Sequence, residues 1–187
     1  MAIGLWRKWR EERLLQRRAA AYVRHLEREP AEDDVRWLAG EATRGDLDHA
    51  RWELRYARRA LGLLVAERDA LDDRTASAVA QALQAALGRD PHVAAAKLDV
   101  ARQQLNSRLR AYGEVLQHRV PGVTSGERLG RTLIGFAGSL PSTALIARGG
   151  ELLAGYVADA NEALRREFGV ASLPEDVPPS AVQTRAG

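Results

Sequence analysis

The sequence predicts an all-α fold: a bundle of about six or seven helices around one central helix. Ala, Leu, Arg and Glu dominate the 187 residues, whereas the β-branched and aromatic residues that favour strands are sparse. Apolar residues recur at steps of three and four along most of the chain, which is the helical period. Hydrophobic residues make up 45% of the chain, enough for the core of a single domain.

Residues 46–70 predict the central helix, because this segment is apolar on two faces. One face is a continuous stripe of Leu47, Ala50, Leu54, Ala57, Leu61 and Leu64. The roughly opposite face carries His49, Trp52, Tyr56 and Leu63. The flank between the two faces carries Arg51, Arg55 and Arg58. A helix with two apolar faces is usually sandwiched between neighbours or used in assembly, so we expect this one to contact the rest of the protein or a second copy.

The N-terminal residues 1–28 predict a basic amphipathic helix, with eight bases and three acids. Its second half has an apolar stripe that includes Leu15, Tyr22 and Leu26, whereas Trp6 and Trp9 lie on a different face. The two parts therefore cannot both face one flat surface if the helix is straight. We expect the tryptophans to pack at one end of the bundle or to bind a partner, with contact to a membrane surface through residues 1–10 as the alternative.

Local signals divide the middle of the chain. Pro30 and Gly45 bound a short helix over about 31–44, and Asp46 suits the N-cap of the central helix. A break near residues 71–73 should separate the central helix from the next one, which ends at Gly88. Asp90 is then predicted as the N-cap of a one-sided helix over about 91–118.

The last third of the chain begins with a loop at residues 120–126. Thr124 or Ser125 should cap a helix that runs to about Ser139, and Pro141 separates it from a final helix ending near Phe168. Close backbone packing would explain a set of helical glycines, namely Gly130, Gly135, Gly138, Gly149, Gly150 and Gly155. These elements predict one helical domain over 1–169, followed by a flexible tail over 170–187, which lacks periodicity.

Chemical motifs are sparse in this sequence. With no cysteine, disulfides and thiolate sites are excluded. Asp46, His49 and Glu53 have a spacing that could bind a metal, but the Glu-x-x-His pattern of di-iron bundles is absent. We therefore expect Asp46 to cap its helix and Glu53 to be solvated. The sequence predicts no metal, no cofactor and no catalytic residue, and it favours internal salt bridges for the arginine flank over phosphate binding.

The charge distribution bears on the class of partner. Residues 29–187 contain twenty bases and twenty-two acids, so a broad basic surface for nucleic acid is not expected. The longest uncharged run, Thr132–Ala147, has 16 residues, whereas a spanning helix needs about 20 mostly apolar ones. No signal peptide is evident, and the absence of cysteine fits a cytoplasmic protein, with a membrane-peripheral location as the alternative.

The sequence thus predicts a non-catalytic helical protein that acts through helix-mediated association, as an accessory subunit or as a homo-oligomer. Partner-binding candidates fall into two groups: Trp6 and Trp9 in the N-terminal helix, and His49, Arg51, Trp52, Arg55, Tyr56 and Arg58 in the central helix. The first alternative is a peripheral membrane protein that docks through its N-terminal helix. The second alternative is a helical bundle that binds a metal, as an enzyme or a carrier.

Overall fold

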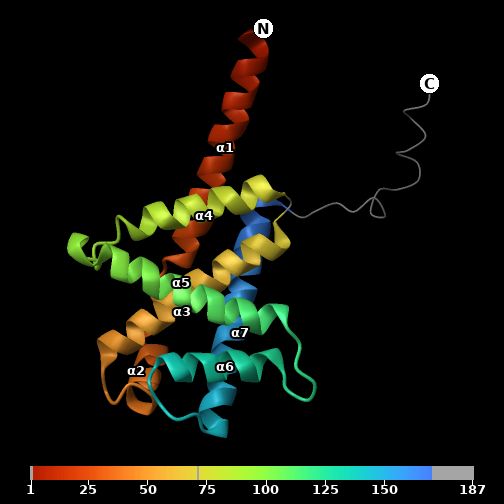
Figure 1. The fold of residues 1–187 in the computed structure, drawn as a ribbon. Coiled ribbons are helices and arrows are strands. Elements are labelled where there is room, and N and C mark those ends of the chain that lie inside the picture. Colours follow the sequence, from red (N-terminus) through yellow and green to blue (C-terminus); the bar gives the residue numbers. More distant parts are fainter. Residues whose placement is uncertain (1, 71, 170–187) are drawn as a thin grey trace.

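A computed structural model describes residues 2–70 and 72–169, with side chains from residue 6 onward (Figure 1). Seven α-helices and a single 3₁₀ turn, η1, make up the secondary structure of this part of the chain. They are α1 (Ala2–Leu26), α2 (Glu32–Glu41), α3 (Leu47–Asp69), α4 (Asp73–Leu87), η1 (Ala95–Lys97), α5 (Leu98–Gln117), α6 (Ser125–Phe136) and α7 (Thr143–Phe168). The predicted all-α bundle is confirmed. The predicted flexible tail lies outside the described residues.

Helix α3 is the centre of the bundle, as the two apolar faces of its sequence predict. It contacts all six of the other α-helices. Ala50, Leu54 and Leu61 of the main stripe are fully buried, and Leu63 of the second face is also buried. The two ends of the stripe are less covered: Leu47, the first residue of the helix, is 44% exposed, and Leu64 is partly buried.

Side-chain caps fix most of the predicted boundaries. The carboxylate of Asp46 accepts a hydrogen bond from the His49 amide at 2.9 Å, and Asp72 caps α4 after the predicted break. Thr124 and Glu127 form a reciprocal capping box at the start of α6. The prediction for Asp90 is wrong: α5 begins only at Leu98, because the carboxylate of Asp90 is bound by a buried arginine of α3 and stabilises a turn instead.

Glycines bring α6 and α7 into direct backbone contact. A Cβ at Gly130 would lie 2.0 Å from the Ile146 carbonyl oxygen, and a Cβ at Gly150 would lie 2.4 Å from the Gly126 carbonyl oxygen. Close packing therefore explains Gly130 and Gly150, as predicted. It does not explain Gly135 or Gly155, where an added Cβ would meet nothing within 4 Å.

Helix α1 has two halves with different surroundings. From Ala19 to Leu26 its inner face is buried against α3, α4 and α7, and the hydroxyl of Tyr22 donates a hydrogen bond to the Gly62 carbonyl of α3 at 2.7 Å. The first turns of the helix extend beyond the bundle, as the red end of the ribbon in Figure 1 shows, whereas Glu12 and Leu15 still contact it. Every residue from Trp6 to Leu14 is exposed. The apolar face of the second half therefore packs on the bundle, whereas the face that carries Trp6 and Trp9 is exposed to solvent.

Candidate functional site

The projecting half of α1, residues 6–18, presents two tryptophans to solvent. Trp6 is 63% exposed and Trp9 is 50% exposed. Their ring centroids are 5.7 Å apart, and the guanidinium of Arg13 lies 4.1 Å from the Trp9 ring centroid. Large exposed aromatic side chains that are clustered in this way mark interaction surfaces more often than isolated apolar residues do.

The same segment is strongly basic. Among residues 6–18 there are six bases and two acids. One of the acids, Glu12, accepts hydrogen bonds from Gln16 at 3.0 Å and from Arg74 of α4 at 2.9 Å, and these contacts lower the pKa of its carboxyl group. The projecting half of α1 therefore combines an aromatic cluster with a surplus of positive charge.

The second group of predicted residues lies on α3, and its aromatic pair is covered by the protein itself. The rings of Trp52 and Tyr56 are 5.3 Å apart. Tyr56 is buried and Trp52 is partly buried. Burial raises the pKa of the Tyr56 hydroxyl, and the guanidinium of Arg108 lies 5.5 Å from its ring centroid. This face thus contacts α5 in the described structure instead of forming an open surface.

The prediction that Glu53 is solvated is wrong. Glu53 forms a two-point ion pair with Arg108 of α5, with oxygen–nitrogen distances of 2.5 and 3.1 Å. The exposed fractions of the two side chains are 4% and 8%. The guanidinium of Arg108 also stacks on Phe136 of α6, 4.2 Å from the ring centroid. The ion pair joins α3 to α5 across 55 positions of sequence, a separation that no local pattern reveals, and the stacking on Phe136 adds α6.

Asp46, His49 and Glu53, whose spacing could suit a metal, form other contacts at the start of α3. Asp46 caps the helix, and His49 Nε2 lies 3.4 Å from the carboxylate of Glu53, which Arg108 already occupies. Within residues 2–70 and 72–169, no cluster of three or more His, Cys, Asp or Glu side chains is arranged to hold a metal ion.

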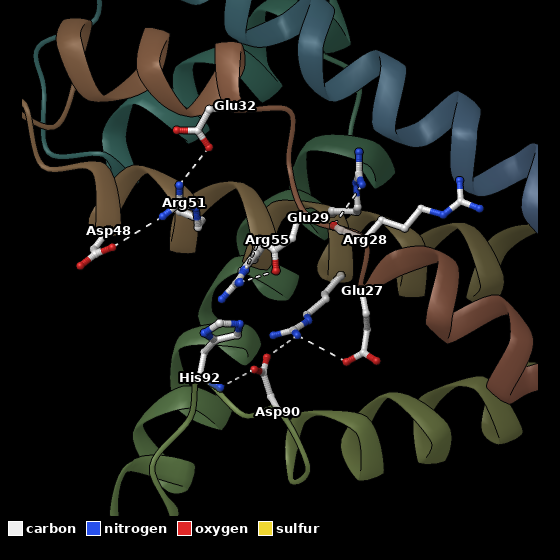
Figure 2. A network of polar contacts seen from close by, with 11 residues as sticks. Glu27, Arg28, Glu29, Glu32, Asp48, Arg51, Arg55, Asp90 and His92 are labelled. Carbon is white, nitrogen blue, oxygen red and sulfur yellow. Dashed lines mark hydrogen bonds and ion pairs between the residues drawn. The ribbon is translucent and has the colours of Figure 1, made fainter.

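The arginine flank of α3 is paired inside the protein (Figure 2). Arg51 donates a hydrogen bond to Glu32 of α2 at 3.0 Å. Arg55 donates from Nε and Nη2 to the two carboxylate oxygens of Glu29. Arg58 donates to the carbonyl of Arg28 at 3.2 Å. These contacts tie α3 to α2 and to the connection between α1 and α2. Arg51 and Arg55 form the internal ion pairs that the sequence favours, and Arg58 forms a hydrogen bond to the backbone.

One further arginine, Arg59, was missed by the sequence reading. Its side chain is only 4% exposed, and its Nη2 donates to Asp90 at 2.6 Å and to Glu27 at 3.4 Å. Burial alone would raise the pKa of Asp90, but hydrogen bonds from Arg59 and from the His92 amide hold it below its ordinary value. Its position one helical turn after Arg55 could have indicated that Arg59 lies on the same side of the helix as the flank.

Arg55 and Arg59 border a cleft of about 240 Å³, which we call the arginine cleft. Its other polar walls are Glu27 and Glu29, which follow α1, and Arg89, Asp90 and His92, which follow α4; Ala86 and Pro91 complete the lining. The structure thus separates the predicted residues into two places. The arginines of α3 gather beside this cleft and the α1–α2 connection, whereas Trp6 and Trp9 lie near the N-terminal end of α1.

Comparisons with protein-family models, with curated proteins and with solved structures found no match for this chain. Among the helices of the described residues, none is both long and apolar enough to cross a bilayer. Function must therefore be inferred from the exposed tryptophans and the polar network themselves.

Proposed function

We propose that this is a non-catalytic helical protein that binds a partner protein through the projecting half of α1. The observation that supports this proposal is the exposed pair Trp6 and Trp9 on a helical segment that extends beyond the bundle. The bundle fixes the other half of the same helix, so the tryptophans are held in a defined direction.

The two tryptophans can supply part of the energy of binding, and the rest must come from the groups around them. A tryptophan buries up to about 250 Å² in an interface, and both residues keep half or more of their surface exposed here. At about 25 cal/mol per Å², covering the remaining roughly 100 Å² of each ring contributes about 2–3 kcal/mol. Tryptophan and arginine are also the residues most enriched among those that dominate binding energy.

The charge of the segment favours an acidic partner over a second copy of the same segment. Two projecting halves packed side by side would each bring six bases and two acids, and the like charges would repel. An acidic surface with an apolar groove would instead be complementary. Association should then weaken as salt rises, because the surrounding charges are exposed and screened.

Affinity capture from the native cell extract tests the proposal. The full chain, the double variant Trp6→Ala with Trp9→Ala, and a control should be compared as baits. The control, Arg7→Ala with Glu11→Ala, removes an exposed pair from the same segment and keeps its net charge. We expect circular dichroism to show all three baits folded. A protein captured by the wild type and the control but lost with the tryptophan variant supports the proposal, and the absence of any such protein contradicts it.

An anionic membrane surface is the second candidate partner. Arg10 and Arg13 lie over the rings of Trp6 and Trp9, which combines aromatic and basic groups in the manner of helices that bind at lipid interfaces. Flotation with vesicles containing anionic lipid tests this candidate. Binding that is abolished by salt and by the tryptophan variant would support it, and absence of wild-type binding at low salt would remove it.

Self-association through the second face of α3 is less well supported than association through α1. Tyr56 is 8% exposed and stacks with Trp52, so most of this face is already in contact with the protein itself. We expect Trp52→Ala with Tyr56→Ala to lower the melting temperature without any dependence on protein concentration. A concentration-dependent shift from a larger species to a monomer, measured by light scattering, would instead assign the face to assembly.

A further inference from the structure

The two exposed tryptophans lie on a stripe of α1 that continues into a groove. At 100° per residue, six residues fall within a sector of about 80° on the helix, and none of them is buried: Trp6, Trp9, Arg13, Gln16, Ala20 and Arg24. The last three of these residues also line a groove of about 460 Å³ between α1 and α4, which we call the α1–α4 groove. The tryptophan pair and the α1–α4 groove are therefore parts of one face.

The floor of the α1–α4 groove is apolar and consists of small side chains. Ala20 and Val23 line it on the side of α1, and Ala82, Ala85 and Ala86 line it on the side of α4. Ala85 is exposed, and Ala20 and Ala82 are half-buried, so part of this apolar surface is open to solvent. Binding of an amphipathic helix with its apolar side in such a groove is a recurring mode of protein recognition.

The acids of the projecting half of α1 are already paired, so the charge that remains there is positive. Glu11 lies 3.7 Å from Arg7, and Glu12 lies 2.9 Å from Arg74 of α4. Five bases of the same segment form no ion pair with the described residues, namely Lys8, Arg10, Arg13, Arg17 and Arg18. A partner segment on this face is therefore favoured if it is acidic.

Two further arginines border the α1–α4 groove itself. Arg24 and Arg89 are exposed, and neither forms an ion pair within the part of the chain that the structure describes. Glu27, the acid of the groove, is partly buried and lies 3.4 Å from Arg59. An occupant with carboxylates beside its apolar side chains would complement this rim, whereas a basic occupant would be repelled.

From these observations we propose that an acidic amphipathic helix of the partner protein binds along this face and places apolar side chains in the α1–α4 groove. The inference rests on the proposed function, because the same partner covers Trp6 and Trp9. The stripe from Trp6 to Arg24 is about 27 Å long at 1.5 Å per residue, so the bound helix spans about 18 residues. Its carboxylates pair with Arg13, Arg24 and Arg89, and the grooves between its side-chain ridges receive the tryptophan rings.

A synthetic peptide of this chemistry tests the proposal on the full chain. The peptide has about 18 residues, with leucine at alternating steps of three and four and glutamate or alanine at the other positions. Fluorescence anisotropy of the labelled peptide measures its affinity. The controls are a peptide of the same composition in scrambled order and a peptide with lysine in place of glutamate. We expect saturable binding of the acidic amphipathic peptide, binding of the scrambled peptide that is at least about tenfold weaker, and no binding of the lysine peptide.

A matched pair of variants tests whether the α1–α4 groove is occupied. Ala85→Glu places a carboxylate in the groove at an exposed helix position, so the chain should still fold while the affinity for the peptide falls at least about tenfold. Gln84→Glu adds the same charge at the neighbouring exposed residue, which does not line the groove, and should change the affinity less than about twofold. Circular dichroism checks that both variants fold.

Three results would overturn the inference: equal effects of the two variants, equal binding of the scrambled peptide, or no saturable binding of the acidic peptide. Failure of the inference can be told apart from failure of the proposed function. If Trp6→Ala with Trp9→Ala abolishes peptide binding and Ala85→Glu does not, the groove is not used, and docking through the projecting half of α1 stands. If no peptide binds, the acidic helix is excluded, and the affinity capture decides the proposed function by itself.

Discussion

The buried ion pair of Glu53 and Arg108 allows a quantitative test of how α3 is held. Its N–O distance is 2.5 Å, and both side chains are less than a tenth exposed. Replacing Glu53 by Leu would leave the Arg108 guanidinium buried with only Gln104 as a polar partner on its own helix. Removing one partner of a buried pair typically destabilises a protein by about 3–5 kcal/mol, which is a large share of a stability of about 5–15 kcal/mol.

Urea unfolding followed by circular dichroism at 222 nm measures this effect. We expect Glu53→Leu and Arg108→Met each to lower the free energy of unfolding by about 3–5 kcal/mol, and the double variant to lose less than the sum of the two. The control is Arg36→Met, because Arg36 and Asp33 have the same 2.5 Å separation but are 64% and 86% exposed. This change should cost less than about 1 kcal/mol.

Two results would refute this reasoning. If Glu53→Leu costs no more than the exposed control, burial does not set the strength of the pair. If the double variant loses as much as the two single changes added together, the two side chains do not depend on each other for their energetic effect.

Three other predictions concern packing, pH and the chain end. Gly150→Ala should destabilise the protein by about 1–3 kcal/mol, because its Cβ would meet a carbonyl oxygen of α6, whereas Gly155→Ala should be neutral or stabilising by up to about 1 kcal/mol in the same urea assay. Burial lowers the pKa of His25 from 6.5, so the folded state binds fewer protons there than the unfolded chain does. Stability from this residue is present above pH 6.5 and is lost as pH falls through the lowered value, and His25→Gln should flatten that part of the curve of unfolding free energy against pH. Truncation after Gly169 should shift the melting temperature by no more than a few degrees, since the removed sequence offers no apolar periodicity.

The elements of the fold were readable from sequence where local chemistry decides them. Asp46 and Thr124 cap their helices through side chains three residues from their partners, so the signal lies within one turn. The two-faced pattern of residues 46–70 likewise predicted the central position of α3. These features depend on periodicity and on short-range hydrogen bonds, which a single sequence displays directly.

The polar interior was not readable in the same way. Asp90 has the sequence context of an N-cap, yet its carboxylate pairs with Arg59, 31 positions earlier in the chain. Glu53 looks solvated beside His49 on a helical wheel until α5 brings Arg108 against it. The choice among several acids for each arginine is made by the tertiary arrangement. For the same reason, the sequence could name the arginines of the flank but not the cleft that two of the α3 arginines border.

Continuity of α1 has a thermodynamic consequence for whatever binds its tip. Starting a helix is the costly step of helix formation, because the first hydrogen bond requires several residues to be ordered at once. The packed turns from Ala19 to Leu26 provide that nucleus, so the projecting turns only extend an existing helix. Their amides should exchange with solvent much faster than those around Tyr22, through fraying from the free end. A bound partner would suppress this fraying, and protection of the amides near Trp9 would record the binding even where no heavy atom moves.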